Sequence, residues 1–137
     1  MHPSLVPGLT HSLSFTVPRE KTVPFLYPES EHFAVMPEVF ATGFMVGLME
    51  WCCIAAIAPH LEAGEGSLGT MVEITHEAAT PPGMTVTVDC TLEKVEGRQL
   101  IFSVVARDET DLIGRGRHGR SVVNWQKFVE KVGKKAG

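Results

Sequence analysis

The sequence has no excess of basic residues, no visible secretory signal and few cysteines, and each of these features argues against a class of protein. Twelve lysines and arginines stand against 16 aspartates and glutamates, so a broad surface for nucleic acid is not expected. The N-terminal residues show no basic segment followed by an apolar one. The three cysteines lack the spacing with histidine that is typical of metal sites. We therefore expect a cytoplasmic protein in a reducing environment, with no metal and no other cofactor.

One apolar stretch, residues 39–58, dominates the chain, and Glu50 is its only formal charge. About 20 apolar residues suffice to cross a membrane, and Gly43 and Gly47 form a G-x-x-x-G pair. Three features argue against a membrane span: the central carboxylate, flanks without a Lys/Arg cluster, and β-rich sequence after residue 67. The stretch therefore predicts the core helix of a soluble domain.

Alternating apolar and polar residues predict one strand before this helix and four after it. The predicted strands cover residues 9–17, 68–78, 84–94, 99–107 and 112–124. Helical spacing returns over residues 125–132. This order predicts a single α+β domain over residues 1–137 with one antiparallel sheet. The order also matches the hot-dog fold, in which a sheet wraps around one long helix and two subunits usually pair.

Residues 18–37, which precede the helix, combine four prolines with many apolar side chains. The prolines argue against a long helix. The apolar residues leave two interpretations open: a lid over a pocket, or a loop packed on the core.

Three polar residues stand where they are locally unexpected: Thr42, Glu50 and His76. Glu50 lies in an apolar helix, and His76 falls on the apolar face of the strand predicted over residues 68–78. A carboxylate beside an imidazole would solve both desolvation problems, and it is also a catalytic arrangement. A Glu–His pair buried in the core, with Thr42 as a helix cap, is the alternative.

Spacing limits how these residues can meet. In one unbroken helix, Thr42 and Glu50 would be about 12 Å apart along the axis and roughly 80° apart around it. Either Thr42 precedes the helix, or the residues meet through substrate or across a dimer. The glycine-rich turn at residues 64–70 could offer backbone N–H groups to an oxyanion.

The last predicted strand carries a dense basic group: Arg115, Arg117, His118 and Arg120. Such residues could bind the phosphates of a carrier such as coenzyme A. Charges exposed to solvent on a strand are the alternative, and we expect that state for at least two of the four.

Four long and specific stretches resemble motifs of a known family. They are K-T-V-P-F-L-Y-P-E-S (21–30), P-E-V-F-A-T-G-F-M-V-G-L-M-E-W (37–51), G-E-G-S-L-G-T (64–70) and T-H-E-A-A-T-P-P-G (75–83). The family is that of the fluoroacetyl-CoA thioesterases, hot-dog hydrolases of acyl-CoA. The resemblance implies that Thr42, Glu50 and His76 form the catalytic set and that Gly69 lies beside the thioester carbonyl. It also implies a homodimer without a metal.

The sequence departs from the family in the segment before the helix. The family carries an aromatic residue immediately ahead of P-E-V-F, whereas this chain has Met36 there and keeps Phe33. A flexible thioether closes a small pocket differently from a rigid ring. We expect an acyl-CoA thioesterase for short acyl groups, with Phe33, Met36, Gly69 and Arg120 at the substrate. A non-catalytic acyl-CoA or small-ligand binder is the alternative, and hydratase chemistry on the same fold is a weaker one.

Overall fold

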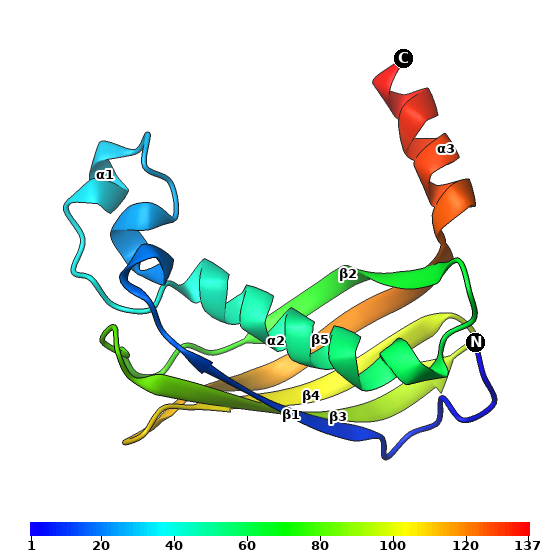
Figure 1. Cartoon of the computed structure of the whole chain (residues 1–137), viewed down its shortest axis with the longest axis horizontal. Helices are drawn as coiled ribbons and strands as arrows, with labels where there is room; N and C mark the ends of the chain where they lie inside the picture. Colours follow the sequence, from blue (N-terminus) through cyan, green and yellow to red (C-terminus); the bar gives the residue numbers. More distant parts are fainter.

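The computed structural model describes residues 1–137 and shows one antiparallel sheet curled around a central helix (Figure 1). The strand order across the sheet is β1-β3-β4-β5-β2, so β1 and β2 are the two edges. The strands are β1 (Thr10–Thr16), β2 (Glu65–Ile74), β3 (Thr85–Glu96), β4 (Gln99–Arg107) and β5 (Leu112–Asn124). The predicted α+β plan with one antiparallel sheet is confirmed.

The alternation of apolar and polar residues along β3 explains which face of this interior strand packs on the helix. Val86, Val88, Cys90 and Leu92 alternate with polar residues along β3, and these four side chains are buried. One face of the strand therefore packs on the helix while the other faces water. Hydroxyl pairs link the polar face of β3 to edge strand β1, as between Ser14 and Thr87 (3.0 Å).

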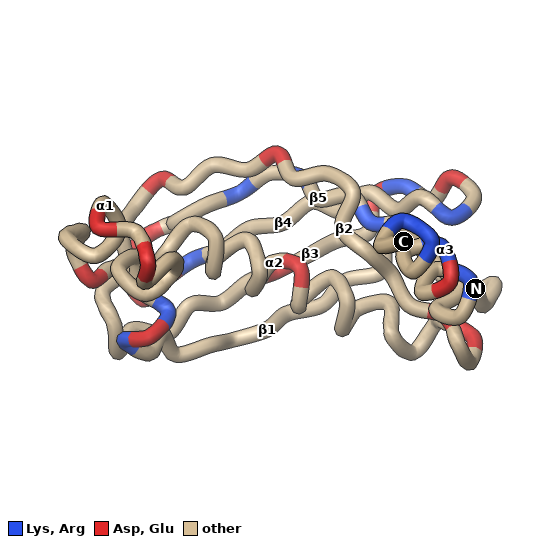
Figure 2. The backbone as a smooth tube through the Cα atoms, turned by 90° about the horizontal axis from the view of Figure 1, so that it is seen from above, with Lys and Arg blue, Asp and Glu red and all other residues tan.

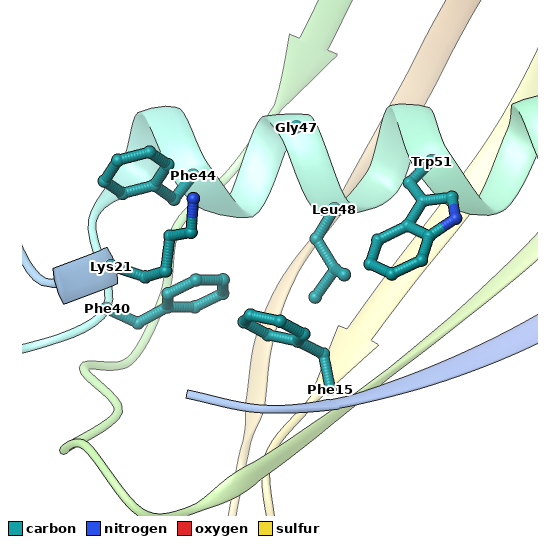
Figure 3. A pocket seen from close by; sticks show the side chains of 7 residues that line it. All are labelled: Phe15, Lys21, Phe40, Phe44, Gly47, Leu48 and Trp51. Carbon is teal, nitrogen blue, oxygen red and sulfur yellow. The ribbon is translucent and has the colours of Figure 1, made fainter. Parts of the chain in front are cut away.

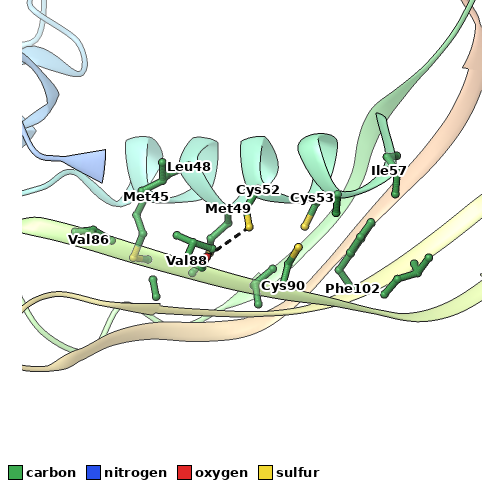
Figure 4. Packing of buried hydrophobic residues seen from close by; sticks show 14 of the residues in the cluster. Met45, Leu48, Met49, Cys52, Cys53, Ile57, Val86, Val88, Cys90 and Phe102 are labelled. Carbon is green, nitrogen blue, oxygen red and sulfur yellow. Dashed lines mark hydrogen bonds between the residues drawn. The ribbon is translucent and has the colours of Figure 1, made fainter. Parts of the chain in front are cut away.

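The central helix, α2 (Thr42–Ile57), packs one face onto the sheet (Figure 4). Its buried residues are Met45, Leu48, Met49, Cys52, Cys53, Ala56 and Ile57. Together with the short helix η3 (Ala58–His60), it is long and apolar enough to cross a membrane. The prediction of a core helix holds on the side that faces the sheet, whereas Trp51 and Ile54 on α2 are exposed in the single chain. One apolar face of α2 is thus left uncovered.

Two segments project from this core, near opposite ends of α2 (Figure 1). Residues 18–41 form three short helices before α2: η1 (Arg19–Lys21), η2 (Val23–Phe25) and α1 (Glu31–Ala34). The C-terminal helix α3 (Trp125–Ala136) has no buried residue and carries four lysines. Figure 2 shows charges on these two segments and on the strands. In the sequence of α2, Glu50 is the only charged residue.

Candidate active site

Thr42 and His76 meet at the start of α2. Thr42 is the first residue of the helix, and Ala41 occupies the cap position, so the Thr42 hydroxyl does not cap the helix. Instead, Thr42 Oγ1 lies 2.7 Å from His76 Nδ1. His76 follows β2, which ends at Ile74, two residues before it and earlier than the sequence predicted. Both side chains line a cavity of about 300 Å³, whose other residues are Val23, Val39, Phe40, Glu77, Ala78 and Ala79.

The imidazole of His76 is set up to act as a base. Burial lowers its pKa below the usual 6.5, so the ring is neutral at pH 7. A neutral ring can accept the Thr42 proton at Nδ1 when its own proton is on Nε2. His76 Nε2 is buried and has no hydrogen-bond partner within the chain. The ring therefore has an unused donor position, which an acceptor outside this chain could satisfy.

Glu50 lies elsewhere on α2 and contacts other residues. Its side chain is 37 % exposed, and Oε1 lies 3.1 Å from Nη1 of Arg120. Because Thr42 is itself helical, the eight-residue spacing keeps the two side chains apart, and the expected pairing of Glu50 with His76 does not occur within one chain. Of the arrangements left open by the sequence, a meeting through substrate or across a dimer remains.

Gly69 on β2 allows the carboxylate of Glu50 to come close. A Cβ at this position would lie 2.7 Å from Glu50 Oε1, so any larger residue would displace the carboxylate. A register shift between Gly69 and Met71 interrupts the pairing of β2 with β5 at the same place. Such a bulge takes backbone groups out of the ladder and makes them available to a ligand.

Arg120 is an interior residue of β5, and its side chain is only 4 % exposed. Its Nε donates to Ser67 Oγ (2.8 Å), and Nη2 donates to the Ser67 carbonyl (2.9 Å). Within this chain the guanidinium is thus held between Ser67 and Glu50 and does not extend into solvent. Substrate contact by Arg120 stays a prediction.

The other two arginines of the strand are exposed, as expected for solvated charges. Arg115 pairs with Glu77 at 3.2 Å, and Arg117 pairs with Glu73 at 3.5 Å. Sequence reasoning missed the roles of Ser67 and His118 beside Arg120. Every second residue of a strand points to the same face, so counting back from the buried Val122 along β5 would have placed Arg120 and His118 on the buried face.

The segment before α2 contributes unequally to the cavity at Thr42. Val23 lines it, whereas Phe33 stacks on Tyr27 with ring centroids 5.8 Å apart and Met36 is 48 % exposed. Neither Phe33 nor Met36 lines the cavity of its own chain. Their predicted contact with substrate is thus not made by the single chain alone.

A second cavity, of about 230 Å³, lies on the β1 side of α2 (Figure 3). Its walls are mostly apolar, and the Lys21 ammonium lies 4.6 Å from the centre of the Phe44 ring. This cavity has no carboxylate or imidazole in its lining, unlike the cavity at Thr42 and His76. Its lining residues are Phe15, Lys21, Phe40, Phe44, Gly47, Leu48 and Trp51. The chain has no group of three or more histidine, cysteine or acidic residues that could hold a metal ion.

Comparison with known proteins identifies relatives of this chain. Residues 17–126 match the sequence profile of a family described as fluoroacetyl-CoA-specific thioesterase. The fluoroacetyl-CoA thioesterase of Streptantibioticus cattleyicolor is 61 % identical over 121 residues, which cover 88 % of this chain and 87 % of the relative.

Solved structures agree with the sequence comparison. A threonine-to-serine variant of fluoroacetyl-CoA thioesterase, in complex with acetyl-CoA, superimposes with a TM-score of 0.95 at 56 % identity. The match covers 97 % of this chain and all of the other. A hot-dog-like protein from Thermanaerovibrio acidaminovorans, 23 % identical, superimposes with a TM-score of 0.82 over 99 % of this chain and 94 % of its own. The predicted hot-dog fold is confirmed.

Proposed function

This chain belongs to the fluoroacetyl-CoA-specific thioesterase family and hydrolyses an acyl-CoA to a free acid and CoA, and we propose that Thr42, Glu50 and His76 carry the reaction. The observation that carries the assignment is the 2.7 Å contact between Thr42 Oγ1 and His76 Nδ1 in a cavity. A hydroxyl beside a neutral imidazole is the arrangement that activates an oxygen nucleophile.

His76 acts as general base and then as general acid. It accepts the proton of the nucleophile as a bond forms to the thioester carbonyl carbon, whether the nucleophile is Thr42 Oγ1 or a water that Thr42 holds. The carbon–sulfur bond breaks, and the imidazolium returns the proton to the departing CoA thiolate. If Thr42 is acylated, a water repeats the cycle and releases the acid. The neutral state of His76, which burial favours, supports the first step.

The active protein is a homodimer, and each site combines residues of two subunits. Three observations support this proposal. β2 is an unpaired edge strand next to the exposed Ile54 of α2. His76 Nε2 lacks a partner, and Glu50 cannot reach Thr42 within one chain. Pairing β2 with its copy about a two-fold axis covers the edge and runs the two α2 helices antiparallel.

In this dimer, Thr42 and His76 of one subunit face Glu50, Gly69 and Arg120 of the other, with the thioester between them. Gly69 lies beside the carbonyl, where the β-bulge frees backbone groups. Glu50 assists the attack or the orientation of His76. The paired α2 helices also bring the segment before α2 of each subunit toward the far end of its partner, so Phe33 and Met36 contact the acyl group from the lid.

We propose short acyl groups, fluoroacetyl among them, as substrates. The match to a family described as specific for fluoroacetyl-CoA supports a short chain. Met36 is flexible where the family has an aromatic residue, so we expect weaker selection between fluoroacetyl and acetyl. The three cysteines are free, which supports the expected reducing, cytoplasmic location.

Release of free thiol from a panel of acyl-CoAs tests the proposed function. We expect hydrolysis of short acyl-CoAs, loss of hydrolysis in Glu50→Gln, and a higher fluoroacetyl-to-acetyl ratio in Met36→Phe. Hydrolysis by Glu50→Gln at the wild-type rate would remove Glu50 from the reaction. Thiol release that is equal for short and long acyl chains would contradict the proposed substrate class.

A further inference from the structure

His118 is a buried histidine that the proposed reaction does not use. Its side chain on β5 is only 3 % exposed, and Nδ1 lies 2.8 Å from the carbonyl oxygen of Met71. A carbonyl can only accept, so Nδ1 carries the proton and donates it. The neutral ring then has its lone pair on Nε2, which lies 3.1 Å from Nη1 of Arg120. His118 is therefore fixed as an acceptor for Arg120.

Arg120 in turn has a fixed set of partners. Nη1 has two hydrogens and two neighbours, His118 Nε2 and Glu50 Oε1, each at 3.1 Å. Nε and Nη2 are both engaged by Ser67. The guanidinium is planar, so contacts on these sides leave it one orientation. The chain thus holds one carboxylate oxygen of Glu50 and leaves the other, Oε2, without a hydrogen bond.

We propose that His118 is a positioning residue, which fixes Arg120 and, through it, the carboxylate of Glu50. The proposal rests on the role assigned to Glu50 above. Without the acceptor on His118, a buried N–H of Arg120 would have no partner, and the guanidinium would shift to find one. Glu50 is partly exposed and is held in the chain by Arg120, so it would lose its fixed direction. Small displacements of a reacting group reduce turnover strongly.

His118 can accept a hydrogen bond from Arg120 only while its ring is neutral. The charged groups that face it are Arg120 on its own strand and Glu50 on α2 at 4.0 Å. β2 presents the Met71 carbonyl, and the register neighbours Val72 and Phe102 are uncharged. Burial, aided by the charge of Arg120, lowers the pKa of His118, so the ring is neutral at pH 7. A proton on Nε2 would face the guanidinium with a second donor and a second positive charge.

Three variants test the positioning role. His118→Leu removes the acceptor, and we expect kcat to fall about tenfold while KM changes by less than about twofold. His118→Gln keeps an acceptor near the position of Nε2 and should recover most of kcat. Val88→Ala is the matched control: it loses buried side-chain volume on β3, which β4 separates from β5, and it should keep the wild-type kcat.

The pH profile separates positioning from a merely structural role. In the wild type, turnover requires neutral His76, and a proton on His118 should lower kcat by about a further tenfold, so the fall of log kcat at acid pH should be steeper than a slope of one. In His118→Gln the slope should be about one, because one of the two protons is gone. If His118→Leu does not fold, the slope of log kcat at acid pH in His118→Gln is by itself the test of the positioning role.

The outcomes distinguish this inference from the proposed function. An inactive Glu50→Gln together with a wild-type rate in His118→Leu would overturn the role of His118 and leave that of Glu50 intact. A fully active Glu50→Gln would instead overturn the proposed function. An acid slope that is the same in the wild type and in His118→Gln would also overturn the positioning role.

Discussion

The two polar regions of this molecule are built differently. Thr42 and His76 share one hydrogen bond at a cavity, and one ring nitrogen of His76 is left without a partner. Glu50, by contrast, lies at the end of a network in which Arg120 makes four hydrogen bonds. Burial keeps the sparsely bonded imidazole of His76 neutral and able to accept a proton from Thr42, whereas a network of this kind holds a charge in place. The first region is suited to proton transfer and the second to electrostatic orientation.

The largest expected effect is the loss of turnover when His76 is replaced. His76→Ala should lower kcat by about 10²- to 10⁴-fold, because it removes the general base. The melting temperature should stay close to that of the wild type, since the imidazole makes only one side-chain hydrogen bond. Thiol release measured beside a thermal melt checks both parts. Wild-type turnover would remove His76 from the mechanism.

The acid limb of the same assay tests the state of His76. Its pKa is lowered from 6.5 by burial, so the neutral base persists below pH 6.5 and activity is lost only as the pH falls through the lowered value. The wild-type kcat/KM should therefore be constant from pH 8 to below about 6.5. An acid limb that begins above this value would contradict the neutral, buried imidazole.

Substitution of Arg120, at the centre of the network, should lower the free energy of unfolding. Arg120→Met leaves Ser67, His118 and Glu50 without their partner, and we expect the free energy of unfolding to fall by about 3 kcal/mol. This is the lower end of the usual range because the carboxylate of Glu50 is 37 % exposed and partly solvated. Urea denaturation at a fixed protomer concentration measures the change.

An exposed arginine on the same strand provides the control for this prediction. Arg115→Met removes a solvated pair with Glu77, and it should change the free energy of unfolding by less than about 0.5 kcal/mol. Equal losses in Arg120→Met and Arg115→Met would mean that the buried network adds nothing, and the contrast between the two regions would disappear.

A smaller effect is expected where the two regions approach substrate. Gly69→Ala places a methyl group 2.7 Å from Glu50 Oε1 and should lower kcat about tenfold by displacing the carboxylate. Gly133→Ala, in α3 with open space around it, should leave kcat unchanged. Steady-state kinetics of both variants checks the prediction. An unchanged kcat in Gly69→Ala would show that Glu50 does not need its observed position.

Periodicity predicted much of the fold but little of the site. The alternation in β3 and the length of the apolar stretch were sufficient for the sheet and for α2. Glu50 and His76 were recognisable because each is polar in apolar surroundings. The partner of Glu50 was missed because glycines at 114, 116 and 119 obscure the alternation that buries Arg120. Strand pairing between β2 and β5, which brings Ser67 near Arg120, is a long-range contact that local patterns do not contain.

The activity itself was predicted from resemblance rather than from spacing. Thr42 and Glu50 are eight positions apart in one helix, and no pattern within one chain indicates how they act together. In the structure, Thr42 contacts His76, whereas Glu50 contacts Arg120. The proposed assembly of the site from two subunits accounts for both groups of contacts, because each subunit supplies one group to a shared substrate.

Mixed dimers test this central claim most directly. Subunits carrying His76→Ala and subunits carrying Glu50→Gln are each expected to form inactive homodimers. When they are combined, one of the two shared sites regains an intact His76 and an intact Glu50, so thiol release should recover to as much as about half the wild-type rate per dimer. If mixed dimers form, as separate affinity tags would show, and remain inactive, Glu50 and His76 do not act across the subunit interface.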